Sequence, residues 1–153
     1  MNAFVHHFAF EFRTGIRNKQ LLLLYYLFPL GFYLMMGFIM AEINPAFREV
    51  IIPALVVFAA LSATLLGIPD PLVNARENGI FRSYKINGIP SFSILVIPAL
   101  TAMMHFAIVT VIITATAPWL FDAPLPDNWL NYACIVTVRA SSFAGICVLI
   151  GVI

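Results

Sequence analysis

Arg139 and His105 are ionisable residues that each lie within a long apolar stretch of this sequence. An arginine at the centre of a bilayer costs at least about 2.5 kcal/mol on insertion scales, so its side chain is expected to face protein or water. Arg139 could then line a path through the membrane or an interface between two subunits, helped by Ser141 and Ser142. His105 could serve as a proton relay or as a haem ligand.

Both residues also have a plainer, structural interpretation. If residues 129–138 lie partly in the membrane interface, the Arg139 side chain extends to the lipid headgroups, and the sequence favours neither interpretation of this residue. For His105 the sequence favours a packing role with a hydrogen bond. A haem would usually take a second histidine at matching depth, whereas His6 and His7 lie near the N-terminus, outside the long apolar stretches.

No residues are grouped in the manner of a catalytic, metal or nucleotide site. Membrane enzymes that act on lipid or isoprenoid phosphates typically hold Mg²⁺ with clustered oxygen ligands. Asp70 and Glu77 have no second carboxylate three or four residues away, and the phosphate-binding loop G-x-x-x-x-G-K-[ST] is absent. We therefore predict no catalytic residue, no metal site and no cofactor. An integral-membrane enzyme for lipid or isoprenoid phosphates, or a membrane anchor or assembly protein, remains an alternative.

The composition indicates that lipid is the solvent for most of the chain. Of the 153 residues, 62% are hydrophobic and only 10% are charged. Soluble domains contain about 25% charged residues, and a chain of this length could not cover so much apolar surface with polar groups. The net charge of +1 gives no sign of nucleic acid as a partner.

The apolar stretches predict four transmembrane helices, since about 20 apolar residues cross a bilayer as a helix. The predicted spans cover residues 21–40, 51–68, 92–118 and 129–153. The chain is therefore expected to be an all-α integral membrane protein with a single transmembrane domain over 1–153. Because the last span ends without a flanking charge, a turn residue or a polar tail, we expect a truncated chain with further spans beyond it.

Basic residues predict the orientation of these spans in the cytoplasmic membrane. Cytoplasmic segments carry an excess of Lys and Arg, and the segment before the first span and the segment between the second and third spans both do so. We therefore expect a multi-pass protein with a cytoplasmic N-terminus. The basic residues of the two segments are Arg13, Arg17, Lys19, Arg76, Arg82 and Lys85, against Arg48 on the opposite side.

Two amphipathic segments lie on the predicted cytoplasmic side. Residues 3–14 place Phe4, Phe8 and Phe12 on one helical face, which suits a helix that lies in the membrane interface. In residues 70–86, Asp70 is placed to cap a helix with proline at its first position, and an apolar stripe opposes polar residues. Such a helix suits either the docking of a cytoplasmic partner or a position on the lipid headgroups.

The order of these elements resembles the permease subunit of ABC-2 type transporters. The segment between the second and third spans contains Arg-Glu-x-Gly at Arg76, Glu77 and Gly79, followed by a basic and apolar run over 80–85. The resemblance covers essentially the whole chain in the order and spacing of its elements. One departure is Ile80, where many members of the family have threonine.

The resemblance implies a transport function without catalysis by this chain. Residues 70–86 would be the coupling helix that sits in a cleft of a separate ATP-binding subunit, which binds the ATP. The chain would supply the first four of six spans, pair with a second permease copy or a homologous half, and export its substrate. Few polar groups line the spans, which favours an amphipathic or lipid-like substrate. The docking residues would be Asn74, Arg76, Glu77, Asn78, Gly79, Arg82 and Lys85, and a transport path or interface could include Arg139, His105 and Ser141.

Overall fold

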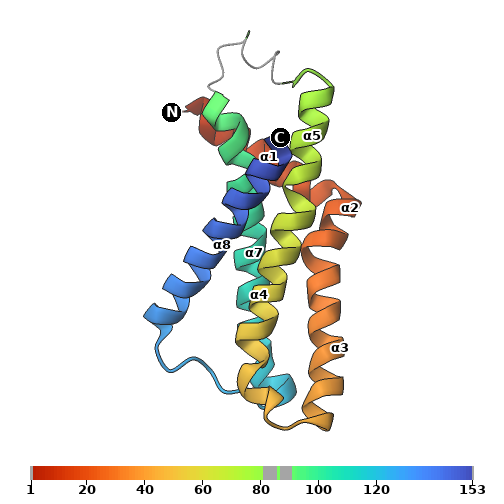
Figure 1. Cartoon of the computed structure of the whole chain (residues 1–153), viewed down its shortest axis with the longest axis vertical. Coiled ribbons are helices and arrows are strands. Elements are labelled where there is room, and N and C mark those ends of the chain that lie inside the picture. Colours follow the sequence, from red (N-terminus) through yellow and green to blue (C-terminus); the bar gives the residue numbers. More distant parts are fainter. Residues whose placement is uncertain (1, 81–85, 87–90, 153) are drawn as a thin grey trace.

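The computed structural model describes residues 2–80, 86 and 91–152, and the described part of the chain contains helices and no strands (Figure 1). A short π-helical turn, η1, interrupts the first long helix. The elements are α1 (Asn2–Arg17), α2 (Lys19–Leu22), η1 (Leu23–Leu27), α3 (Phe28–Ile43), α4 (Phe47–Gly67), α5 (Pro69–Glu77), α7 (Ser91–Phe121) and α8 (Trp129–Val152).

The predicted all-helical architecture with four potential spans is confirmed. Four helical segments in the described residues are long and apolar enough to cross a membrane. The first joins α2, η1 and α3, and the second joins α4 and α5, so each is longer than the predicted apolar stretch. The four segments are Lys19–Ile43, Phe47–Glu77, Leu95–Phe121 and Trp129–Gly151.

The first segment changes its helical geometry just before Pro29. Asn18 starts α2, because its Oδ1 accepts hydrogen bonds from the backbone N–H groups of Gln20 (3.0 Å) and Leu21 (3.4 Å). Pro29 has no backbone N–H to donate to the turn before it, and η1 occupies that turn. The wider π turn contains Tyr25, whose side chain is buried among the helices.

The helix α4 lies at the centre of the bundle, in contact with α3, α7 and α8 (Figure 1). Small residues let its neighbours approach closely. A methyl group at Gly67 would overlap the ring of Tyr25, whose hydroxyl donates a hydrogen bond to the Gly67 carbonyl over 3.1 Å. At the opposite end of the bundle, Arg48 and Asp122 form an ion pair of 3.5 Å that connects α4 with the end of α7.

Only one half of α8 packs firmly on the bundle. Its buried residues are Ala140, Ala144, Cys147 and Gly151, which lie on one helical face in the half that contacts α4 and α5. Figure 1 shows that the other half, which begins at Trp129, diverges from α4 and α7. Hollows lined by side chains lie along this half of α8.

The predicted helix over residues 3–14 lies within α1. This helix packs against α7 at the end of the bundle where the chain begins. Phe8 and Phe12 are half-buried, whereas Val5 is exposed. Part of the predicted apolar face therefore contacts protein. The location of α1 in the membrane interface stays a prediction.

Candidate functional site

Two regions contain the candidate residues: the end of α5 and the space beside α8. The helix α5 follows α4 after a break at Ile68, whose N–H still donates to the Thr64 carbonyl over 3.2 Å. The expected start at Asp70 is wrong, because the helix begins at Pro69. Proline suits this first position since it has no N–H that would need a partner. The helix α5 continues in the direction of α4 rather than turning sideways, and it packs against α8 (Figure 1).

The end of α5 also differs from the expected end near residue 86. The helix ends at Glu77, and the N–H groups of Asn78 and Gly79 donate to the carbonyls of Asn74 (3.0 Å) and Arg76 (3.1 Å). Gly79 has φ of 67°, the left-handed conformation that glycine adopts at helix ends. The Asn-Gly pair at 78–79 is the stop signal that the amphipathic pattern obscured.

The structure brings five of the seven expected docking residues together at the end of α5. All five are exposed: Asn74, Arg76, Glu77, Asn78 and Gly79. The other two, Arg82 and Lys85, lie outside the described residues. On the opposite side of α5, Leu72 is buried against α8, where a Cβ added to Gly151 would lie 2.9 Å from Leu72 Cδ1. The helix thus presents polar groups outward and an apolar side to the bundle.

Three hollows surround the diverging half of α8. Their volumes are about 340, 220 and 330 Å³, and Tyr132 lines all three. The hydroxyl of Tyr132 shares a hydrogen bond of 2.8 Å with the Thr114 hydroxyl of α7, so this side chain bridges the gap between the two helices. Tyr132 thus lines both the hollow on the α4 side and the two hollows that lie between α7 and α8.

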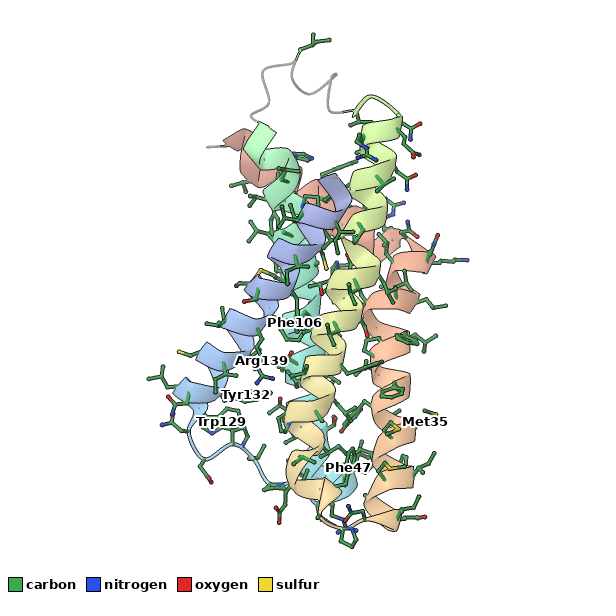
Figure 2. All side chains as sticks on the ribbon, viewed as in Figure 1. Met35, Phe47, Phe106, Trp129, Tyr132 and Arg139 are labelled. Carbon is green, nitrogen blue, oxygen red and sulfur yellow. The ribbon has the colours of Figure 1, made fainter. Side chains whose placement is uncertain are left out.

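Arg139 lines the 220 Å³ hollow between α4 and α8. Figure 2 shows its side chain extending from α8 toward α4 and α7. The side chain is exposed, and within the described part of the chain no hydrogen bond or ion pair engages its guanidinium. Since α8 begins at Trp129, Arg139 lies ten residues, or about 15 Å, along the helix.

Ser141 and Ser142 do not join Arg139 in this hollow. Their hydroxyls donate to the carbonyls of Thr137 (2.8 Å) and Val138 (2.9 Å) on their own helix. Two residues along a helix correspond to a rotation of about 200°, so Ser141 points away from the side that carries Arg139. Neither serine lines the hollow beside Arg139, and a role of Arg139 and Ser141 in a transport path or interface stays a prediction.

His105 lies apart from all three hollows, in the contact between α1, η1 and α7. Its side chain is fully buried, and Nδ1 lies 2.6 Å from the Tyr26 hydroxyl, with which it shares a hydrogen bond. The imidazole stacks on Phe12 and Tyr25 with ring centroids 4.8 and 4.6 Å away. This is the environment of a packing histidine with a hydrogen bond, as the sequence favours. In the part of the chain that the structure describes, no group of three or more His, Cys, Asp or Glu side chains could hold a metal ion.

Sequence reasoning missed Tyr132, although its spacing gave a signal. Tyr132 lies seven residues before Arg139, and seven residues are almost two full helical turns, so both side chains lie on the same face. The buried hydroxyl of Thr110, for which the described residues provide no hydrogen-bond partner, was also missed. Thr110 lines the two hollows between α7 and α8.

Comparison with known proteins finds no match: no protein-family model, no curated protein and no solved structure matches this chain. The resemblance to the ABC-2 permeases therefore stays a prediction from the order of the elements and the Arg-Glu-x-Gly pattern.

Proposed function

We propose that this chain is a permease subunit of an ATP-binding-cassette transporter of the ABC-2 type. It moves an amphipathic or lipid-like compound out across the cytoplasmic membrane, as a dimer with a second permease copy or a homologous half. The observation that supports this proposal best is the exposed polar end of α5, which lies beyond the end of α4 and away from the three hollows.

The packing of α5 suits the transmission of movement. The helix continues α4 through a single residue, Ile68, and its buried Leu72 contacts Gly151 of α8. A force applied to the exposed end at Glu77 therefore reaches two long helices at once. A flexible connector between spans would not couple a partner to the bundle in this way.

The ATPase is a separate subunit in this proposal, because the sequence lacks a phosphate-binding loop. The partner contacts the exposed residues at the end of α5, among which Glu77 supplies a negative charge and Asn74 and Asn78 supply amide groups. Arg82 and Lys85 belong to the same proposed contact.

The test is co-purification of an ATPase with the intact protein from its native membrane. Wild type is compared with a double variant, Glu77→Arg with Arg82→Glu, and with Glu42→Arg as a matched control. Glu42 is also an exposed glutamate near a helix end, but it lies at the far end of α3. We expect the ATPase to be lost from the double variant and retained by the control. If no ATPase co-purifies with wild type, or the charges at 77 and 82 have no effect, the proposal is wrong.

A further inference from the structure

We propose that the hollow between α4 and α8 binds the anionic headgroup of a single-chain amphiphile at a point part-way across the membrane. Its wall is apolar except at Arg139 and the hydroxyl of Tyr132, which already bonds to Thr114. The remaining lining residues are Pro53, Val56, Val57, Ala60, Phe106, Ile135 and Val136. Largely apolar walls with a few placed polar groups are typical of small-molecule sites.

The charge of Arg139 selects the sign of the ligand. A guanidinium carries five N–H donors and stays protonated, and in the described residues no carboxylate pairs with it. An acidic headgroup supplies acceptors for two parallel hydrogen bonds, which is the geometry that arginine prefers with carboxylate and phosphate. A cationic headgroup would be repelled, and a neutral one would leave the charge uncompensated.

The depth of Arg139 distinguishes this ligand from the surrounding bilayer lipid. Arg139 is about 15 Å along α8 from Trp129, whereas the hydrocarbon core of a bilayer is about 30 Å thick. Headgroups of resting phospholipids lie at the surface. If α8 enters the membrane at Trp129, as this proposal assumes, an anion that contacts Arg139 in the hollow lies below the level of the headgroups.

Because α8 diverges from the bundle, the apolar chain of the ligand can extend out of the hollow. Ile135 and Pro53 are exposed at the rim of the hollow, so a chain attached to the bound headgroup extends past them into lipid. The hollow holds about 220 Å³, which suits one headgroup and the first part of one chain. This site adds the charge of the substrate's headgroup to the proposed function. A role of the site in transport rests on that function, whereas the binding of an anion at Arg139 does not depend on it.

The test is photo-crosslinking of the intact protein in phosphatidylcholine vesicles. One probe is a long-chain alkyl phosphate with a diazirine in its chain, and the second is the uncharged alcohol of the same chain. Wild type is compared with Arg139→Gln, Arg139→Lys and Arg48→Gln, since Arg48 lies at the end of the bundle in an ion pair with Asp122. Labelled peptides are located by mass spectrometry.

We expect the phosphate probe to label peptides of α4 and α8 in wild type and to label them about tenfold less in Arg139→Gln, because a charge-assisted hydrogen bond is lost. Arg139→Lys keeps most of the labelling and Arg48→Gln keeps all of it. Equal labelling by the phosphate and the alcohol, or labelling of Arg139→Gln at the wild-type level, overturns the proposal.

Two further arms exclude the other occupants of the hollow. If phosphatidylglycerol in the vesicles suppresses labelling as well as unlabelled alkyl phosphate does, the occupant is bulk lipid and the proposal is wrong. If Val136→Cys forms a disulfide with a second copy in high yield and labelling is absent, the hollow is a subunit interface and the proposal is also wrong. Neither arm uses an ATPase, so failure here is distinct from failure of the proposed function.

Discussion

The hydroxyl of Tyr26 and Nδ1 of His105 lie 2.6 Å apart and share a hydrogen bond that joins η1 to α7. The imidazole also stacks on Phe12 of α1 and Tyr25 of η1. One buried side chain of α7 thus contacts both α1 and η1, which are distant from α7 in sequence. Gly15 of α1 allows this contact, because a Cβ there would lie 3.1 Å from His105 Nε2.

This contact predicts energetic coupling between Tyr26 and His105. Interhelical hydrogen bonds in membrane proteins contribute about 0.6 kcal/mol on average and up to about 1.7 kcal/mol. A double-mutant cycle with Tyr26→Phe and His105→Phe should give a coupling energy in this range, measured by unfolding in detergent. Phenylalanine at 105 keeps a ring between Phe12 and Tyr25.

The control is a cycle between Tyr26→Phe and Thr116→Val. Thr116 bonds to Tyr33 over 3.0 Å rather than to Tyr26, so the effects of these two changes should add. Additive effects for Tyr26 and His105 as well would mean that the 2.6 Å contact contributes nothing to stability.

Gly37 and Gly31 of α3 provide a second prediction. A methyl group at Gly37 would overlap the ring of Phe121, which is buried and packs edge-on against Tyr33 with centroids 5.4 Å apart. Gly37→Ala should therefore reduce the free energy of unfolding by about 1–3 kcal/mol, the usual cost of overpacking. Outside the backbone of its own helix, no atom of the described residues lies within 4 Å of a Cβ added to Gly31, so Gly31→Ala should have little effect. Equal effects of the two changes on thermal unfolding in detergent would contradict the packing of α3 on Phe121.

The four long helices could be predicted from the sequence because their signal is local. Each is a long stretch of apolar residues, and length and composition suffice to identify it. The favoured interpretation of His105 followed from the absence of a second histidine at its depth. The identity of its neighbours could not be predicted, because Phe12, Tyr25 and Tyr26 meet His105 only through the long-range packing of α1 and η1 against α7.

The end of α5 and the divergence of α8 were not predicted, for different physical reasons. At α5, the apolar stripe of the sequence continues past Asn78-Gly79. The amphipathic pattern alone therefore does not reveal that the helix ends there, at a glycine with a left-handed backbone conformation. Along α8, apolar residues cover all sides of the helix, and such a helix gives no sign of which face packs. Only the placement of small residues at Ala140 and Ala144 marks the half that contacts α4.

The orientation of the bundle yields a third prediction, testable in intact cells. In a variant without Cys134 and Cys147, a single cysteine is introduced at Asn128 or at Asn78, both of which are exposed. Asn128 precedes α8, and Asn78 follows α5 at the opposite end of the bundle (Figure 1). Because basic residues favour the cytoplasm, a membrane-impermeant maleimide should label Asn128→Cys in intact cells and Asn78→Cys only after permeabilisation. The reverse pattern would show that the N-terminus is outside.

Gly79 gives the last prediction, because its backbone conformation rather than its packing requires glycine. Its φ is 67°, and among the described residues outside its immediate chain neighbours no atom lies within 4 Å of an added Cβ. The left-handed conformation costs most residues about 1–2 kcal/mol, whereas asparagine adopts it more readily. A β-branched residue has the greatest difficulty with it, so Gly79→Val should disturb the turn after Glu77, while Gly79→Asn should preserve it.

The measurement compares ATPase co-purification and thermal unfolding for these two variants. Since the turn lies beyond the packed part of α5, Gly79→Val should leave the unfolding temperature of the bundle unchanged and weaken ATPase binding several-fold. Gly79→Asn should match wild type in both measurements. If Gly79→Val binds the ATPase as well as wild type does, binding of the partner does not depend on the turn at the end of α5. A lowered unfolding temperature would instead mean that the turn stabilises the bundle itself. Weaker ATPase binding by Gly79→Val would then not be evidence for a coupling helix.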